Sequence, residues 1–396
     1  MSIAAFSVAR LPEIRFGAGR IRETAEVLAQ FGRKALIVTG GRSFVSTPQW
    51  AALQEALSAA GMEWETMQVT QEPSPELVDA AVARFRSAGI EVVAGIGGGS
   101  VLDAAKAIAG LLVPGNSVMD HLEGVGRGVP YAGPALPFIS VPTTAGTGSE
   151  ATKNAVLSVQ GSDGFKKSFR HDALVARVAI VDPELLASCP KDLIAANGMD
   201  AFTQLLESYV STNANPFTDA LALAGLKAFR DGFWEAWEEG HPRQQHGYAG
   251  VAYASLMSGI TLAQAGLGSV HGLASPLGAF FPIPHGVVCG TLVAEATAVN
   301  IHALRERVPQ AVALKKYADV GRLLGASDAA DDAACDALVE RLHAWTERLR
   351  LPRLQAFGVT AADIDRIVQG SRGGSMRTNP LVLEDAELAG LLRAQL

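Results

Sequence analysis

The chain has 396 residues, of which 48% are hydrophobic and 18% are charged. It therefore holds enough apolar material for two packed domains of about 100–200 residues each. This balance excludes a disordered or a collagen-like chain. The formal net charge of −7 also argues against a nucleic-acid partner, whose backbone is itself negatively charged.

Three features of the sequence bear on the compartment in which the chain works. Cys189, Cys289 and Cys335 lie far apart and form no Cys-x-x-Cys pair, so we expect reduced, buried thiols in a cytoplasmic protein. Segment 1–6 has no basic stretch ahead of an apolar run, and we expect no signal peptide. Segment 244–294 has no Asp, Glu, Lys or Arg, but Gly, Ser, Pro and His interrupt it so often that we expect buried helices and no membrane span.

The first half of the chain alternates between strand-like and helix-like patterns. The strands are predicted at 34–39, 63–69, 92–96 and 137–141, and the helices at 48–60, 75–88 and 101–112. A hairpin-like segment (154–160 and 168–170) precedes a further strand at 178–181. Strands and helices that alternate with short connections predict a parallel sheet covered by helices on both faces.

After residue 183 the pattern becomes helical throughout. Helices are predicted at 185–197, 201–211, 216–237, 247–265, 287–300, 311–324, 331–349 and 361–369, with Gly198 and Pro276 among the residues that break them. We therefore place an α/β domain at 1–183 and an all-helical domain at 184–396, with a cleft between them.

Two glycine-rich loops follow predicted strands. Segment 95–100 (GIGGGS) leads into a helix, where free backbone N–H groups attract phosphate; a tight turn without a ligand is the alternative. Segment 142–150 (PTTAGTGSE) offers hydroxyl groups that suit phosphate or ribose, unless it is a solvated turn. Asp103, one turn into the first helix, is predicted to bond the loop or the ligand. Because both loops end parallel strands, we expect them to share one crevice.

The helical half contains a candidate metal site. Asp200 and Gln204 are four residues apart, so they share a helix face and could offer two oxygens to a cation or simply bond each other. His271 and His285 lie in the charge-free segment, where a histidine is either a satisfied core group or a ligand. One carboxylate and two imidazoles form a plausible triad for a divalent metal.

Five segments of the sequence together resemble one known family. GGGSVLDAAKAIA (97–109), PTTAGTGSEAT (142–152), IVDPELL (180–186), GMDA (198–201) and HGLASPLGAFFPIPHG (271–286) are similar to the iron-containing, or group III, alcohol dehydrogenases. The resemblance spans the chain. It implies a dehydroquinate synthase-like architecture, with an N-terminal dinucleotide-binding α/β domain (parallel sheet) and an all-α C-terminal domain. It also implies an NAD- or NADP-dependent oxidoreductase that acts on small alcohols and aldehydes, and a homodimer.

The resemblance also assigns roles to individual positions. Asp200, His271 and His285 match three of the family's four metal ligands. The residues expected to bind the cofactor are Gly40, Arg42, Ser43, Ser74, Gly97, Gly98, Gly99, Ser100, Asp103, Thr143, Thr144, Thr147, Lys166 and Val181. Within this set, 97–100 would hold the pyrophosphate, and Lys166 and Val181 would line the ribose and adenine side.

Three positions depart from the family pattern. Gln204 stands where the fourth metal ligand is usually histidine, and its amide could ligate the metal, hold a metal-bound water, or do neither. This change makes Zn²⁺ more plausible relative to Fe²⁺. Ser275 replaces a histidine that is a candidate for proton relay, so Ser275, a water chain and the ribose hydroxyl are all candidates for the proton route.

The third departure concerns the choice between NAD and NADP. After the first predicted strand, NAD-preferring members often carry an acid, which bonds the ribose 2′-hydroxyl and repels a 2′-phosphate. This chain has Gly40, Gly41, Arg42 and Ser43 there instead. Because Arg42 and Ser43 could accept the phosphate, we expect NADPH to be tolerated and NADP to be slightly favoured.

The sequence therefore predicts metal-assisted hydride transfer between a nicotinamide and a small alcohol, aldehyde or semialdehyde, with Asp200, His271, His285 and Ser275 as catalytic candidates. Phe202, Leu277, Phe280 and Phe281 suggest a partly apolar substrate pocket. The alternatives are a metal-independent dehydrogenase of the same fold, a dehydroquinate synthase-like lyase, and a nucleotide-binding module without catalysis.

Overall fold

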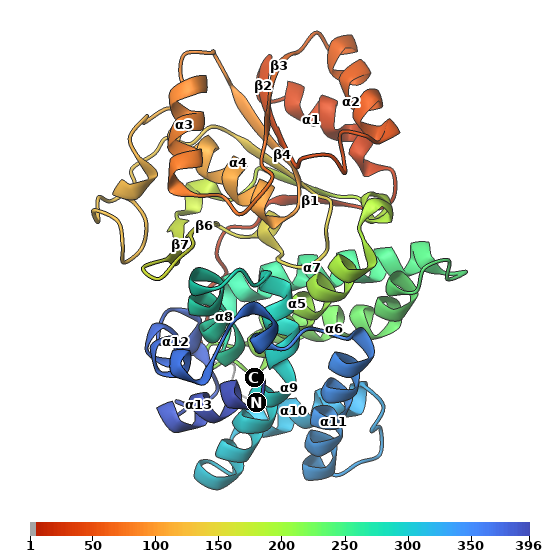
Figure 1. Cartoon of the computed structure of the whole chain (residues 1–396). Coiled ribbons are helices and arrows are strands. Elements are labelled where there is room, and N and C mark those ends of the chain that lie inside the picture. Colours follow the sequence, from red (N-terminus) through yellow and green to blue (C-terminus); the bar gives the residue numbers. More distant parts are fainter. Residues whose placement is uncertain (1–4) are drawn as a thin grey trace.

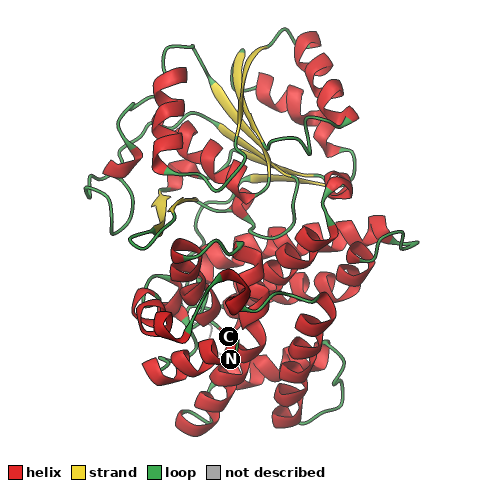
Figure 2. Cartoon of the chain, in the orientation of Figure 1, coloured by secondary structure: helices red, strands yellow, loops and turns green. Residues whose placement is uncertain are grey.

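The computed structural model describes residues 5–396 and consists of an α/β half stacked on a helical half (Figure 1). The strands all lie in the first half, while the second half is built from helices and loops (Figure 2). Part of the segment on which the signal-peptide expectation rests, residues 1–4, lies outside the described residues. The predicted order of an α/β half followed by an all-helical half is confirmed.

A six-stranded parallel sheet forms the centre of the α/β half. Its strands are ordered β1-β8-β5-β4-β2-β3. The direction of winding reverses between β2 and β4, so their carboxyl ends flank the point at which such sheets bind ligands. The bounds are β1 (Glu13–Phe16), β2 (Lys34–Thr39), β3 (Glu63–Gln68), β4 (Val92–Gly97), β5 (Phe138–Pro142) and β8 (Val178–Val181).

Helices cover both faces of this sheet because successive side chains of a strand point to opposite sides. On β2, Leu36 and Val38 pack toward α3 and α4, whereas Ala35 and Ile37 pack toward α1 and α2. The four helices are α1 (Thr24–Ala29), α2 (Pro48–Ala59), α3 (Pro75–Phe85) and α4 (Gly99–Leu111). The predicted hairpin is also present as the antiparallel pair β6 (Asn154–Val159) and β7 (Phe165–Arg170).

The helical half encloses one large apolar core, which also takes in Ala145, Ala151 and Val181 from the first half. Its helices are α5 (Lys191–Val210), α6 (Pro216–Trp237), α7 (Gln244–Ala265), α8 (Ser269–Phe280), α9 (His285–Arg307), α10 (Val312–Leu323), α11 (Asp331–Leu349), α12 (Ile364–Gly370) and α13 (Asp385–Arg393). By length and composition α9 could cross a membrane, but 72% of its apolar window is buried among its neighbours.

Two predicted helix breaks are wrong. Gly198 lies inside the continuous helix α5, because a side chain at this position would meet the ring of Phe233 at 2.3 Å and only glycine permits that approach. Pro276 lies inside α8, where packing against α9 and α12 outweighs one lost backbone hydrogen bond. The region 185–188, predicted as α-helix, is part of a 3₁₀ helix (Pro183–Ser188). The short strand β1 and the helices α1 and α13 were not predicted.

Candidate active site

The two glycine-rich loops meet at the carboxyl end of the sheet, as the sequence predicted. The first loop joins β4 to α4, whose N-cap is Gly98 and so has no side chain to occupy the helix N-terminus. A Cβ atom on Gly99 would lie 2.9 Å from the side chain of Thr147, and one on Gly98 would lie 3.3 Å from Thr144 Oγ1. The hydroxyl groups of the second loop therefore stand beside the free N-terminus of α4, an arrangement that suits a phosphate.

Asp103 and Lys106 fasten the second loop to α4. The Asp103 carboxylate accepts a hydrogen bond from Ser149 Oγ at 2.5 Å, so it bonds the second loop, whereas the sequence indicated a bond to the loop that begins its own helix or to the ligand. Lys106 is fully buried, and its ammonium donates to Ser149 O at 2.9 Å and Asn154 O at 2.6 Å. The ammonium also lies 3.6 Å from Asp103. This buried network fixes the backbone of the loop, a role that the sequence did not assign to Lys106.

The remaining residues that the sequence predicted to bind the cofactor lie in differing surroundings. A side chain at Gly40, after β2, would contact Val101 of α4 at 4.0 Å, which places the β2 loop beside the helix N-terminus. Arg42 and Ser43 are exposed, and Arg42 has no ion-pair partner within residues 5–396. Ser74 is the N-cap of α3, and its Oγ accepts from Leu77 N at 3.2 Å.

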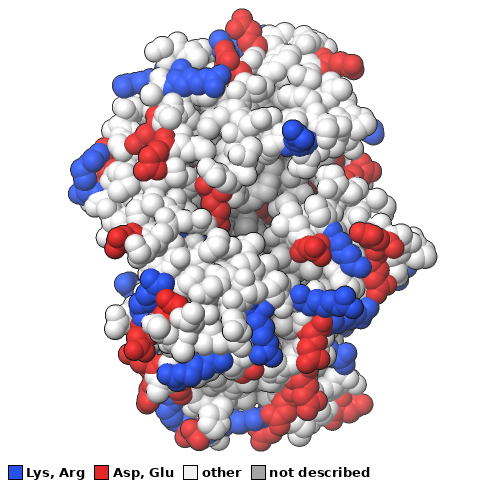
Figure 3. All heavy atoms as spheres, viewed as in Figure 1, with Lys and Arg blue, Asp and Glu red and all other residues white. Residues whose placement is uncertain are grey.

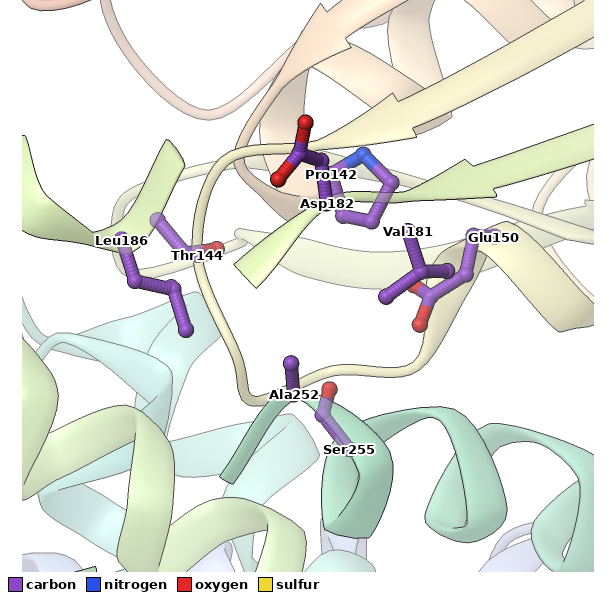
Figure 4. Close-up of a pocket in the computed structure, with 8 residues that line it drawn as sticks. All are labelled: Pro142, Thr144, Glu150, Val181, Asp182, Leu186, Ala252 and Ser255. Atoms are coloured by element: carbon purple, nitrogen blue, oxygen red, sulfur yellow. The ribbon is translucent and has the colours of Figure 1, made fainter. Parts of the chain in front are cut away.

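Thr144 and Val181 line a small cavity of about 10 Å³ between the sheet and α7 (Figure 4). Glu150 also lines it, facing Ser255 of α7, and is 2% exposed. Burial raises the pKa of the Glu150 carboxyl to about 7. The second loop thus extends from the carboxyl end of the sheet to the contact between the α/β half and the helical half.

Four side chains from the helical half converge on one point. Asp200 on α5, His271 on α8, and His285 and Cys289 on α9 each offer a donor atom, and these atoms all lie within 4.8 Å of one another. His271 Nε2 is 3.1 Å from Asp200 Oδ1, and His285 Nε2 is 3.8 Å from the same oxygen. The structure therefore brings together the three predicted metal ligands, and it adds Cys289, which sequence reasoning missed.

The geometry of α5 and α9 explains why these side chains meet. A Cβ atom on Gly286 would lie 2.6 Å from the backbone oxygen of Ala196, and one on Gly290 would lie 2.9 Å from Met199 Cβ. These two glycines, four residues apart on α9, let the helix backbone approach α5 closely. His285 and Cys289 are also four residues apart, so they project together toward Asp200. That spacing was the available signal for Cys289.

A buried carboxylate orients His271. Glu207, two turns beyond Asp200 on the same face of α5, accepts from His271 Nδ1 at 2.7 Å, which leaves Nε2 directed at Asp200. The second Glu207 oxygen accepts from Val270 N at 2.7 Å, in the first turn of α8. Histidines that bind metals commonly donate their other nitrogen to a carboxylate in this way. Sequence reasoning missed Glu207, and its place seven residues after Asp200 was the available signal.

Gln204 does not point its oxygen into the cluster. Its amide nitrogen donates to Asp200 Oδ1 at 3.1 Å, and its amide oxygen accepts from Ser258 Oγ at 2.7 Å. Both ends of the amide are therefore engaged, and the end that faces Asp200 is a donor. In this arrangement Gln204 holds the carboxylate in place.

The charges and orphaned atoms of the cluster fit a divalent cation. Asp200 is 1% exposed, yet its Oδ2 has no hydrogen-bond partner among the residues that the structure describes. Although burial opposes ionisation, the neighbouring His285 and His271 outweigh it and lower the pKa of Asp200. Burial lowers the pKa of His285 to about 4, which keeps that imidazole neutral and able to ligate. Although burial opposes it, the neighbouring Cys289, Asp200 and Glu207 raise the pKa of His271 well above its usual value, so a divalent ion that binds here displaces a proton from this imidazole.

Residues of the α/β half border the cluster. Lys166, on β7, forms an ion pair of 2.7 Å with Glu72, and Ser275 Oγ on α8 donates to the Lys166 backbone oxygen at 3.2 Å. A side chain at Gly146, in the second loop, would lie 2.7 Å from Asn197 Cβ, three residues before Asp200. The second glycine-rich loop therefore packs against α5 close to Asp200, and the surface is hollowed between the two halves (Figure 3).

The apolar pocket predicted from aromatic residues is wrong in part. Phe202 is fully buried in an aromatic cluster, with ring centroids 5.1 Å from Phe229 and 5.3 Å from Trp345. It lies on the side of α5 that faces the core and cannot line a substrate pocket. Phe280 and Phe281 instead lie under the guanidinium of Arg366, at 4.9 Å and 5.2 Å.

Comparison with known proteins matches both halves of the chain. The family model described as iron-containing alcohol dehydrogenase matches residues 12–183, and the one for the C-terminal part of Fe-containing alcohol dehydrogenases matches residues 194–396. Long-chain-alcohol dehydrogenase 1 of Geobacillus thermodenitrificans is 32% identical, over 98% of this chain and 97% of that protein.

Two further relatives support the match. The NAD-dependent methanol dehydrogenase of Bacillus methanolicus is 29% identical, over 96% of this chain and 97% of that protein. The crystal structure of a 1,3-propanediol oxidoreductase superposes with a TM-score of 0.88 at 27% identity, covering 99% of this chain and all of that one. The similarity thus extends over sequence and fold along nearly the whole chain.

Proposed function

Because the chain belongs to the iron-containing alcohol dehydrogenase family and is an NAD-linked alcohol dehydrogenase, we propose that Asp200, His271 and His285 hold its metal ion beside the nicotinamide. The observation that carries this proposal is the close packing of Gly146 against Asn197. This contact places the second loop, which is expected to bind the cofactor, against the helix that bears Asp200. The unpartnered Asp200 oxygen supports a cation at the same place.

The α/β half binds the cofactor, and the helical half positions the substrate. The N-terminus of α4 and the hydroxyl groups of 143–147 bind the pyrophosphate, which fixes the dinucleotide along the sheet edge. The helical half orients the substrate and excludes water from the cleft. The cofactor supplies the hydride chemistry. A divalent ion, when bound, supplies Lewis acidity toward the substrate oxygen.

The route of the proton includes Ser275 as one candidate, beside a water chain and the ribose hydroxyl. The Ser275 hydroxyl lies at the border of the two halves, but it donates to the Lys166 backbone oxygen. It can pass a proton only by releasing that bond. If Ser275 carries the proton, Ser275→Ala alters the pH profile of kcat, whereas Ser275→Thr retains it.

The finer choice of cofactor follows from charge. No acid follows β2, and the exposed Arg42 and Ser43 are free to meet a 2′-phosphate. We infer that NADPH is used at least as well as NADH. Arg42→Ala then raises KM for NADPH and leaves KM for NADH unchanged; equal effects on both cofactors contradict the inference.

The proposed substrates are small alcohols, aldehydes or semialdehydes, and the enzyme is proposed to act as a homodimer in the cytoplasm. Neither a nucleic acid nor a membrane is proposed as a partner. The chain's net charge of −7 supports the first exclusion. Light scattering coupled to size exclusion tests the dimer.

The decisive experiment is a panel of aldehydes and semialdehydes assayed with NADH and NADPH, with and without added Zn²⁺ or Fe²⁺. We expect turnover that falls on chelation and on Asp200→Ala. Turnover that survives both treatments, in protein free of metal by elemental analysis, favours the alternative of a metal-independent dehydrogenase. The family relationship argues against the lyase, and steady consumption of nicotinamide excludes it.

A further inference from the structure

We propose that Cys289 is the fourth metal ligand of this chain, taking the coordination position left open by Gln204. The proposal rests on the proposed function, because it assumes a metal ion at Asp200, His271 and His285. It assigns the site a donor set of one carboxylate, two imidazoles and one thiolate. Gln204 becomes a positioning residue that acts through Asp200.

The distances between donor atoms carry the assignment. A tetrahedral Zn²⁺ ion with Zn–S of about 2.3 Å and Zn–N of about 2.0–2.1 Å sets sulfur and nitrogen about 3.6 Å apart. Cys289 Sγ is 3.6 Å from His271 Nε2 and 3.8 Å from His285 Nε2. Two nitrogen or oxygen ligands of such an ion lie about 3.4 Å apart. The histidine nitrogens lie 3.1 Å and 3.8 Å from Asp200 Oδ1, on either side of that value.

The alternative ligand is unsuited to the position that it occupies. The amide oxygen of Gln204 accepts a hydrogen bond from Ser258. The amide nitrogen of Gln204, which cannot ligate a metal, faces Asp200. The Cys289 sulfur, by contrast, contacts both histidine nitrogens of the cluster. The cluster thus receives two ligands from α9 and one each from α5 and α8.

Binding changes the protonation of Cys289 without changing any oxidation state. The metal–sulfur bond forms as the S–H bond breaks, and the proton leaves to solvent. A thiolate is a soft donor that favours Zn²⁺ over the harder ions. We therefore expect this enzyme to retain Zn²⁺ more firmly than Fe²⁺.

The first test is X-ray absorption at the zinc edge on the full-length, zinc-loaded enzyme, which needs no variant. The proposal requires one sulfur scatterer at about 2.3 Å among nitrogen and oxygen neighbours. A shell of nitrogen and oxygen alone overturns it. This readout does not depend on turnover, so an active enzyme without the sulfur neighbour leaves the proposed function intact.

The second test uses Co²⁺ as a probe of the metal-free enzyme. We expect a near-ultraviolet sulfur-to-cobalt charge-transfer band, which Cys289→Ser removes and the matched buried-cysteine variant Cys335→Ser retains. Cys289→Ser should weaken Zn²⁺ binding by more than the roughly 10- to 100-fold typical of losing an outer hydrogen-bond partner. Gln204→Ala should keep the band and stay within that range. A band that survives Cys289→Ser, or one lost in Gln204→Ala, overturns the proposal.

Circular dichroism of each variant establishes that it folds, and Cys289→Ala replaces the serine variant if that one does not. Sulfur ligation together with an absence of turnover on every aldehyde and alcohol would instead count against the proposed function alone. The two hypotheses therefore fail by different measurements.

Discussion

Glu207 accepts a hydrogen bond from His271 Nδ1 at 2.7 Å, and this contact determines which nitrogen of His271 faces the centre of the site. The same carboxylate accepts from the backbone of Val270, so it fixes the first turn of α8 and the imidazole together. The position of His271 is thus set by a residue on a different helix, 64 positions earlier in the chain.

Glu207→Gln removes one of these two acceptor oxygens, because an amide has only one. We expect Zn²⁺ affinity to fall by roughly 10- to 100-fold while the helical content is preserved. Competition with a chromophoric chelator measures the affinity. Glu306→Gln is the control, since it alters an exposed contact with His302 at 3.4 Å and should change nothing. Equal affinity in both variants would show that Glu207 does not orient the ligand.

Gly99→Ala should weaken cofactor binding. The added Cβ would lie 2.9 Å from the side chain of Thr147, so the two loops must separate where the pyrophosphate binds. We expect the Kd for NADH, measured by fluorescence titration, to rise by about tenfold or more. Gly390→Ala, where a Cβ meets nothing within 4 Å, should leave the Kd unchanged. An unaltered Kd in Gly99→Ala would refute the assignment of this loop.

Lys106→Met should destabilise the α/β half. The buried ammonium bonds several oxygens of the second loop and offsets the charge of Asp103. Its removal leaves that carboxylate without a cation, at a cost of about 3–5 kcal/mol in the free energy of unfolding. Urea denaturation measures this change. The control Lys153→Met breaks an exposed ion pair with Asp172 and should cost about 1 kcal/mol or less. Similar losses in the free energy of unfolding for both variants would contradict the structural role of the buried Lys106.

Glu150 should make the enzyme less stable as the pH rises through the weakly acidic range. Burial raises the pKa of this carboxyl from 4.5 to about 7. Between these values the folded chain keeps a proton that the unfolded chain has lost, so the free energy of unfolding falls with rising pH and levels off above about pH 7. The full effect is about 3 kcal/mol.

Glu150→Gln removes this dependence. Urea denaturation at several pH values between 4 and 8 should show the variant gaining stability over the wild type as the pH rises, with no gain near pH 4. Glu55→Gln, on the exposed face of α2, serves as the control and should follow the wild type. A constant difference across this range would mean that Glu150 titrates normally.

Local sequence was sufficient for much of the fold. The β-branched run 34–39 and the glycines at the end of β4 specify a strand and a strand–helix turn through backbone preferences that act over a few residues. Gly198 and Pro276 misled for the opposite reason. Their local preference is to end a helix, but contacts from Phe233 and from neighbouring helices, which are remote in sequence, decide the outcome.

For the site, too, sequence and tertiary structure each determined a different part. The sequence by itself determined that Asp200, His271 and His285 are ligand-type residues, because they are polar groups in apolar surroundings and match a known pattern. Only the tertiary structure decided that Cys289 joins them, that Glu207 orients His271, and that Gln204 turns its donor toward Asp200. Cys289 reaches the cluster because Gly286 and Gly290 let α9 pack closely against Ala196 and Met199 of α5. Glu207 and Gln204 act through contacts of α5 with α8 and α7, which are equally remote in the chain.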